Sequence, residues 1–305
     1  MKNRNYYFVA AVILLILLIP FIYFNPISNL NESASDEERV ENTNKTKPID
    51  LSNMVPRSEL DQKMQSGWYL VWNDEFGNNN VIEDRYWTLQ TGGGIWGNNE
   101  LQNYSDRPEN CCVEDGKLII KGRKEDYQNY QFTSARITTK EKIDFLYGKI
   151  EVKAKFPRGK GLFPAIWLLP CDDNYVGRKR NGELDLVEIL GNDPTTIYGV
   201  AHYSLENQNR SFVKYSCDST DFSKDFHVYS IEWSPQDIKW FVDDNVYFTL
   251  DLDSTFDNTY NPFNKKFYLI MNLAIGGDWP GNDFDNTGFP SLFEIEYVRY
   301  YKPVN

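Results

Sequence analysis

Residues 149–156 read Lys-Ile-Glu-Val-Lys-Ala-Lys-Phe, so apolar and charged side chains alternate without a break. A period of two puts alternate side chains on opposite faces of a β-strand, and this segment is therefore predicted to be a strand with one face in the core. Comparable runs, separated by Gly, Pro, Asn and Asp, occupy residues 117–121, 163–169, 183–190, 197–203, 227–233, 238–242, 246–250, 267–273 and 293–301.

The spacing of these runs decides the fold class. No long amphipathic helix interrupts them, and Asp243-Asp244-Asn245 between two of them is typical of a hairpin turn. Many short strands over this length predict an all-β protein, a two-sheet antiparallel β-sandwich of the jelly-roll, concanavalin-like type. Because large sandwiches commonly have bent sheets, we expect a concave cleft in which an extended polymer could lie.

Charge and metal-ligating residues exclude two classes of function. The 305 residues include 32 Lys and Arg against 44 Asp and Glu, a net charge of -12. Since phosphates need cationic partners, nucleic acid is not expected to bind. The chain has only two histidines, and its four cysteines form no C-x-x-C pair, so a zinc site is not expected either.

The first 56 residues are predicted to lie outside the folded domain. Residues 6–24 form 19 uncharged, mostly apolar positions preceded by Lys2 and Arg4. At 1.5 Å per residue they would extend about 28 Å, enough to span a bilayer, so residues 1–24 are predicted to be a signal anchor or, less favoured, a cleaved signal peptide. Residues 25–56 read as a flexible polar linker, and residues 57–305 as one β domain.

The positive flank predicts that the domain lies on the extracellular side of the membrane or is secreted, and we expect a monomer. An exported compartment permits disulfides. Cys171 and Cys217 could pair with each other, or either could pair with Cys111 or Cys112.

The segment Gly-Glu-Leu-Asp-Leu-Val-Glu-Ile-Leu at residues 182–190 places three carboxylates in an otherwise apolar strand. Glu183 and Asp185 share a face by simple alternation, whereas Glu188 is one residue out of phase. A β-bulge at Leu186-Val187 would restore the phase, because a bulge inserts one unpaired residue. The three acids would then line one surface.

Three acids so arranged suit a double displacement at a sugar acetal. Four effective strand steps and two inward-leaning side chains leave the Glu183 and Glu188 carboxyls about 5 Å apart, the separation of retaining glycosidases. One Glu would attack the anomeric carbon, the other would protonate the leaving oxygen, and Asp185 would assist the nucleophile. A solvated strand face and an oxygen-rich calcium site are the alternative interpretations.

At this segment the chain resembles glycoside hydrolase family 16, in the bulged E-x-D-x-x-E branch that contains endo-β-1,3-glucanases (laminarinases). The resemblance covers about residues 66–305. Further motifs agree in order: VWNDEF at 71–76, GNNELQNY at 97–104, SARI at 134–137, YGKIE at 147–151, GLFPAIWLLP at 161–170, FHVYSIEW at 226–233, AIGGDWPG at 274–281 and EYVRYY at 296–301. The resemblance implies Glu183 as nucleophile, Asp185 as its assistant and Glu188 as general acid/base.

A second group of residues is predicted to bind the polysaccharide. The resemblance suggests that the cleft is lined by Asn98, Arg136, Trp167, His202 and Trp279. Alternation puts Phe163 on the same face as Trp167, where both rings could stack on sugars, and Trp96 lies in a glycine-rich loop suited to presenting a ring. The alternative interpretations are core packing for the tryptophans, a surface ion pair for Arg136 and a purely structural His202.

The resemblance also bears on cofactors and substrate. The chemistry needs no cofactor, but family members often carry a structural calcium on the convex side, where Glu75, Gly116 and Glu296 occupy the matching positions. Phe163 stands where Trp is usual, and residues 177–179 read Gly-Arg-Lys where Gly-Trp-Pro is frequent, so one cleft wall exchanges an aromatic ring for cations.

The sequence thus predicts retaining endo-hydrolysis of β-1,3-glucan or mixed-linkage β-1,3/1,4-glucan, with the polysaccharide and the membrane as partners. A β-glucan-binding, lectin-like protein is one alternative. A transglycosylase, or a hydrolase of another polysaccharide such as a galactan, is the other.

Overall fold

A computed structural model describes residues 67–77, 80–172, 181–205, 208–216, 220–256, 260–284 and 288–304. The predicted membrane segment and linker lie outside the described residues, as do residues 57–66 and Cys217. Within the described ranges, no helix is long and apolar enough to span a membrane.

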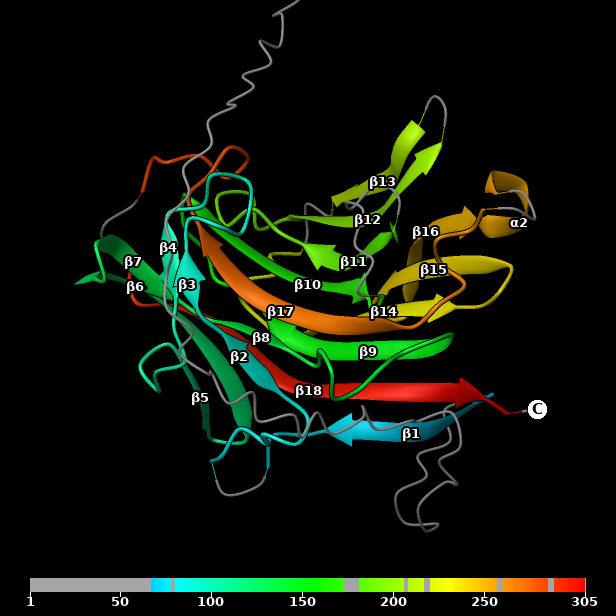
Figure 1. Cartoon of the computed structure of the whole chain (residues 1–305), viewed down its shortest axis with the longest axis horizontal. Coiled ribbons are helices and arrows are strands. Elements are labelled where there is room, and N and C mark those ends of the chain that lie inside the picture. Colours follow the sequence, from blue (N-terminus) through cyan, green and yellow to red (C-terminus); the bar gives the residue numbers. More distant parts are fainter. Residues whose placement is uncertain are drawn as a thin grey trace, which may run out of the picture. The chain divides into compact units, whose positions relative to one another are not determined.

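Two β-sheets make up the domain (Figure 1). The strands of the larger sheet are β1 (Trp68–Asp74), β3 (Gly92–Gly93), β4 (Gln102–Tyr104), β5 (Cys111–Glu114), β6 (Lys117–Tyr127), β7 (Tyr130–Ser134), β9 (Gly148–Lys155), β14 (His227–Trp233), β15 (Asp237–Val242), β16 (Asn245–Asp251) and β18 (Ser291–Pro303). Their order is β16-β15-β14-β9-β18-β6-β7-β4-β3, with β1 paired to β18 and β5 to β6.

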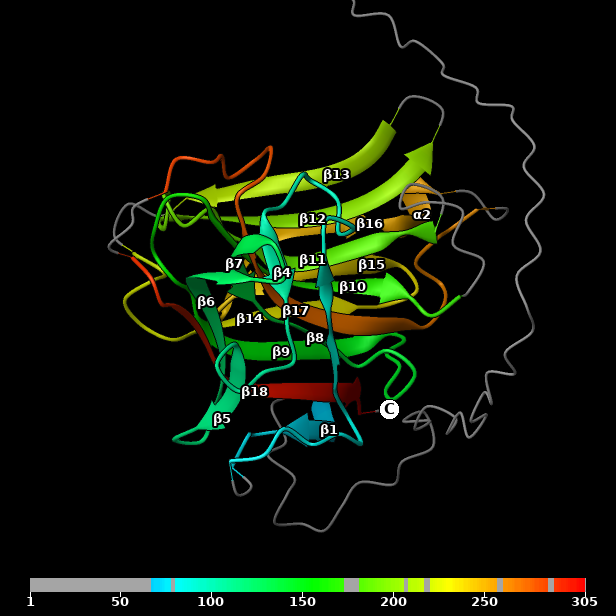
Figure 2. The ribbon, with the colours of Figure 1, turned by 60° about the vertical axis from the view of Figure 1, so that its left-hand side comes forward.

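The smaller sheet carries the cleft. Its strands are β2 (Thr88–Gln90), β8 (Arg136–Thr138), β10 (Leu162–Pro170), β11 (Glu183–Glu188), β12 (Thr196–Leu205), β13 (Gln208–Ser216) and β17 (Phe267–Ile275), in the order β13-β12-β11-β10-β17-β8-β2. Figure 2 shows β12 and β13 as long curved strands at one side of this sheet. Among the described strands, every pairing is antiparallel except β4 with β7, and the one-turn helix α2 (Leu252–Thr255) follows β16. The predicted all-β sandwich is therefore confirmed.

The core lies between the sheets and follows the sequence periodicity. In β9, Ile150, Val152 and Ala154 are buried, as the alternation predicted. β17 is buried at all nine positions, because one of its faces meets the core and the other forms part of the cleft floor. Fully burying such a side chain contributes about 1.5–3 kcal/mol, so these strands anchor the sandwich.

A turn and the cysteines test two smaller predictions. Asp243 adopts a positive φ of 53° in the tight turn between β15 and β16, as the predicted hairpin requires. Cys111, Cys112 and Cys171 are free thiols, so no disulfide forms among the described cysteines.

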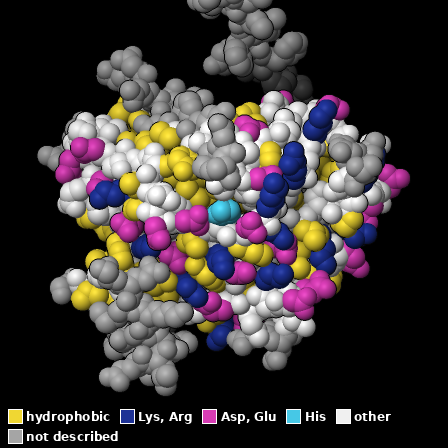
Figure 3. Space-filling view, turned by 180° about the vertical axis from the view of Figure 1, so that it is seen from behind, with side chains coloured by type: hydrophobic (Ala, Val, Ile, Leu, Met, Phe, Trp, Pro, Cys, Tyr) yellow, Lys and Arg dark blue, Asp and Glu magenta, His cyan; other side chains and the backbone are white. Residues whose placement is uncertain are grey.

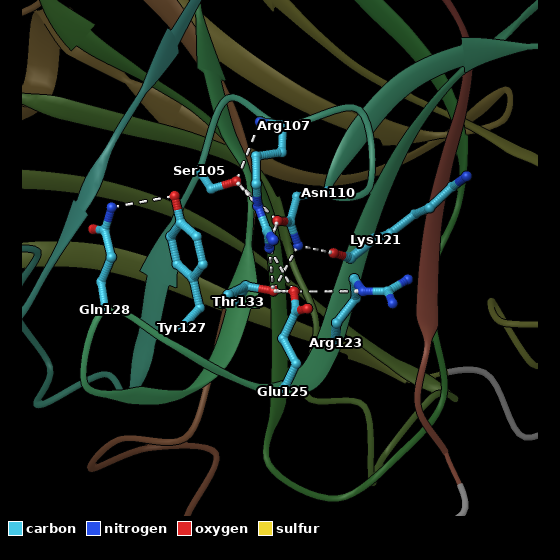
Figure 4. Close-up of polar contacts among 9 residues, drawn as sticks. All are labelled: Ser105, Arg107, Asn110, Lys121, Arg123, Glu125, Tyr127, Gln128 and Thr133. Atoms are coloured by element: carbon cyan, nitrogen blue, oxygen red, sulfur yellow. Dashed lines mark hydrogen bonds and ion pairs between the residues drawn. The ribbon is translucent and has the colours of Figure 1, made fainter.

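A buried polar network fixes the loop after β4 to the hairpin of β6 and β7 (Figure 4). The Arg107 guanidinium donates to Asn110 Oδ1 at 2.8 Å, pairs with Glu125 and lies 4.1 Å from the centre of the Tyr127 ring. Asn110 Nδ2 in turn donates to Thr133 Oγ1 at 2.9 Å. Burial raises the pKa of Glu125, but hydrogen bonds from Thr133 and Arg107 outweigh it and hold that pKa below its usual value. This network therefore joins the loop after β4 to strands β6 and β7.

Charges of both signs are interspersed on the surface seen from behind (Figure 3). No continuous basic surface appears on that face, which agrees with the acidic net charge of -12.

Candidate active site

A β-bulge in β11 sets the direction of the acidic side chains. In the pairing with β10, Ile166 faces Val187 and Trp167 faces Asp185, so Leu186 is the extra residue. In the pairing with β12, Asp185 to Glu188 spans three steps while the partner strand advances two. The bulge predicted at Leu186 and Val187 is present, and it returns Glu188 to the face of Glu183 and Asp185.

The three acids line one cleft of about 450 Å³. Glu183 and Asp185 are 3% and 2% exposed, whereas Glu188 is half-buried at the cleft surface. The two Glu carboxyls therefore lie in different environments, and Glu188 is the one that water can reach.

His202 lies directly opposite Glu183 on β12. Its Nε2 is 3.2 Å from Asp185 Oδ2 and 3.5 Å from Glu183 Oε1. The histidine therefore contacts the two buried acids and is placed to orient their carboxylates.

One wall of the cleft is built around Arg136 on β8. Its guanidinium lies 4.9 Å from the Trp96 ring centre and 4.6 Å from that of Trp167, both within cation–π range. Its Nε donates to Gln90 Oε1 at 2.6 Å. Arg136 is only 8% exposed, so the surface position considered for it is wrong.

A second part of the cleft lining is an aromatic cluster around Trp279, which is 39% exposed. The rings of Phe163 and Tyr198 each pack edge-on against it at 5.0 Å. Trp279 is thus a surface ring held by two neighbours, and not a core residue.

Asn98, directly after the glycine-rich loop at residues 92–97, lines the cleft, and its segment is tied to the loop of Trp279. Asn99 Nδ2 donates to the Asp278 carboxylate at 2.9 and 3.0 Å, and the Asp278 amide donates to Asn98 O at 2.9 Å. A Cβ on Gly277 would lie 2.4 Å from Asn98 O, so only glycine permits this approach. The two loops therefore hold Asn98 and Trp279 in one unit.

All the predicted catalytic and polysaccharide-binding residues line this cleft, together with several that sequence reasoning missed. The additional residues are Glu100, Ala165, Tyr198, Val200 and Asn272. Tyr198 alternates with Val200 and His202 along its strand, which indicates that the three side chains share a face. Asn272 is a polar residue within an apolar run, which also marks it as a candidate site residue. Asn272 Oδ1 accepts from Trp167 Nε1 at 2.7 Å, and its Nδ2 donates to the Tyr104 hydroxyl at 3.1 Å.

The residues matched to calcium lie elsewhere, on the outer face of the larger sheet. Glu75, Gly116 and Glu296 line one depression. Arg299 donates to both Glu75 carboxylate oxygens at 2.7 and 2.8 Å, and Lys153 Nζ lies 2.6 Å from Glu296 Oε2. An ion ligated by these carboxylates would have to displace both cations, so the side chains present do not fit calcium.

A second geometric possibility for a cation lies among the acids themselves. One ligand atom each from Glu183, Asp185 and His202 lies within 4.8 Å of the others. The same closeness also serves the direct contacts of His202 with the two carboxylates.

Residues 98–299 match the family described as glycosyl hydrolases family 16. A β-glucanase from Rhodothermus marinus is 39% identical over 248 residues, covering 77% of this chain and 85% of that protein. A glucan endo-1,3-β-glucosidase from Cryptopygus antarcticus is 41% identical, covering 76% of this chain and 91% of that protein. The X-ray structure of the Rhodothermus marinus laminarinase superposes with a TM-score of 0.73 at 38% identity, covering 78% of this chain and 98% of the other.

Proposed function

The chain belongs to glycosyl hydrolases family 16 and is a glycoside hydrolase, and we propose that it cleaves β-1,3-glucan or mixed-linkage β-1,3/1,4-glucan within the polymer by a retaining double displacement. The observation that carries the mechanism is the bulge, which brings Glu183, Asp185 and Glu188 onto one face of one cleft. The names of the relatives, a β-glucanase and a glucan endo-1,3-β-glucosidase, support the choice of polymer.

In the first step an oxygen of Glu183 bonds to the anomeric carbon while the bond from that carbon to the leaving oxygen breaks. Glu188 gives that oxygen its proton. In the second step Glu188 takes a proton from water, whose oxygen bonds to the anomeric carbon and releases Glu183. Asp185 and His202, whose Oδ2 and Nε2 atoms lie 3.2 Å apart, orient the Glu183 nucleophile. Such a path needs the two Glu carboxyls about 5–5.5 Å apart.

Substrate binding follows from the two parts of the cleft lining. Sugar rings expose flat apolar faces, which suit the exposed ring of Trp279 in the cleft lining. Arg136, held between Trp96 and Trp167, presents hydrogen-bond donors to sugar hydroxyls. An open groove walled in this way accommodates an internal stretch of a chain, which favours endo cleavage.

The test incubates the full chain with laminarin, lichenan, agarose and carrageenan and scores new reducing ends. We expect laminarin and lichenan to shorten and the anomeric configuration of the first product, followed by NMR, to be retained. Shortening of a galactan alone would favour the alternative substrate, and binding without cleavage would favour the lectin-like alternative. Inverted products would exclude the proposed mechanism.

Variants separate the roles of the two Glu residues. E183Q should lose activity by about 10⁴-fold or more on every substrate, because no nucleophile remains. E188Q should lower kcat/KM about 10²–10⁴-fold on laminarin but far less on a dinitrophenyl laminaribioside, because kcat/KM reports the first step, in which that leaving group needs no proton. E109Q, at an exposed Glu that does not line the cleft, is the matched control and should behave like the parent.

We further propose that residues 6–24 hold the enzyme at the membrane with the catalytic domain outside. The supporting observation is the length of the uncharged apolar stretch behind Lys2 and Arg4. Fractionation of expressing cells, followed by protease treatment of intact cells, should find the enzyme in the membrane fraction and accessible. Activity found only in the medium would favour a cleaved signal peptide.

A further inference from the structure

The bulge that aligns the acids also leaves backbone groups of β11 out of the regular ladder. β11 pairs with β10 and β12 on either side, but the register shifts in both pairings between Asp185 and Glu188. Leu186 and Val187 are completely buried. A buried carbonyl without a donor costs about 1–3 kcal/mol, so a bulge here needs donors from outside its own sheet.

Two side chains of the other sheet supply these donors. Trp240 on β15 donates from Nε1 to the Asp185 carbonyl at 2.8 Å, and the Tyr247 hydroxyl on β16 donates to the Leu186 carbonyl at 3.2 Å. The two acceptors are consecutive carbonyls at the bulge itself. Trp240 is completely buried and stacks on Phe248 at 4.7 Å, so its indole N–H is held in place.

Gly199 on β12 makes the room that these donors need. A Cβ at this position would lie 2.8 Å from the Tyr247 hydroxyl and 2.9 Å from Trp240 Cδ1, closer than real contacts allow. Burial, and then the negative charges of Glu188 and Asp185, raise the pKa of the Tyr247 hydroxyl, which therefore stays protonated and able to donate. The glycine and the two donors form one unit beneath the acids.

We infer that Trp240 and Tyr247 are positioning residues for catalysis: by hydrogen-bonding the Asp185 and Leu186 carbonyls from the opposite sheet, they fix the bulge that keeps Glu188 on the same face as Glu183. Because side chains alternate along a strand, relaxing the bulge by one residue would turn Glu188 toward the other face. This inference rests on the proposed function, since it assigns these residues to the geometry of that reaction.

Tyr247→Phe tests the inference with the least disturbance, because it removes one hydroxyl and keeps the ring. We expect kcat on laminarin to fall about 10- to 100-fold, the usual effect of a displacement of about 1 Å, while KM stays within about twofold. The loss of kcat/KM on a dinitrophenyl laminaribioside should be smaller, because kcat/KM reports the first step, in which that substrate does not need the proton of Glu188. A role in packing alone would not produce this dependence on the leaving group.

Tyr229→Phe is the matched control on the same sheet. Its hydroxyl is also buried, but it makes no hydrogen bond within the described part of the chain, so kcat should be unchanged. Trp240→Phe and Gly199→Ala are second variants of the same unit, and the fraction that folds should show the same leaving-group dependence as Y247F.

The outcomes separate the two proposals. If the parent enzyme cleaves none of the polysaccharides, the proposed function fails before the variants matter. If the parent is active and Y247F keeps its kcat on laminarin, or loses kcat/KM equally on both substrates, the positioning role is overturned. The positioning role is also overturned if Y247F lowers the melting temperature but leaves kcat and KM unchanged.

Discussion

Asn272→Leu is the perturbation for which the structure gives the clearest magnitude. Asn272 bonds two buried aromatic side chains at once, Trp167 through its Oδ1 and Tyr104 through its Nδ2. Loss of the acceptor for a buried indole N–H costs about 1–3 kcal/mol, and loss of an ordinary hydrogen bond costs about 1 kcal/mol. The Tyr104 hydroxyl still donates to Glu100 Oε2 at 3.4 Å, so losing its bond with Asn272 contributes the smaller part of the cost. We expect N272L to lower the free energy of unfolding by about 2–4 kcal/mol.

Urea unfolding of the full chain, followed by tryptophan fluorescence, measures this loss. A double-mutant cycle with Tyr104→Phe isolates the second bond: N272L/Y104F should cost about 1 kcal/mol less than the sum of the single changes. A cost below about 1 kcal/mol for N272L would refute the reasoning, because it would mean that the two bonds contribute nothing net.

The same variant has a kinetic consequence. The Trp167 ring lies 4.6 Å from the Arg136 guanidinium in the cleft wall, and Asn272 fixes the orientation of its indole. Release of the ring should raise KM for laminarin about tenfold, equivalent to 1.4 kcal/mol, with a smaller effect on kcat. An unchanged KM in folded N272L would show that Trp167 does not depend on this bond.

Three further predictions concern the rest of the domain. Because Arg299 and Lys153 already engage Glu75 and Glu296, adding calcium or EDTA should shift the melting temperature by less than about 1 °C; a rise of several degrees with calcium would contradict this. Burial raises the pKa of Glu294, but hydrogen bonds from Lys155 and Lys117 outweigh it and lower that pKa. The resulting stability is present above the ordinary pKa of 4.5 and is lost as pH falls through the folded value, so E294Q should lose about 1.5–3 kcal/mol at neutral pH and converge with the parent in acid melts. Trp279→Ala should raise KM about 2- to 10-fold with kcat retained, and steady-state kinetics showing no change would remove Trp279 from the binding surface.

The sequence by itself determined the strand pattern, the bulge and the acids. Alternation in residues 149–156 and the phase error of Glu188 are local properties, because the direction of a side chain depends on its position along its own strand. The motifs shared with family 16 then located both parts of the cleft lining.

Only the tertiary structure decided which distant residues support that site. Trp240 and Tyr247 reach the bulge from the opposite sheet, and Arg299 and Lys153 occupy the depression matched to calcium. These contacts join residues tens to hundreds of positions apart, and they depend on strand order and sheet packing. A periodic pattern within one segment carries no record of such packing, because the partner of a side chain across the core is set by the register of other strands.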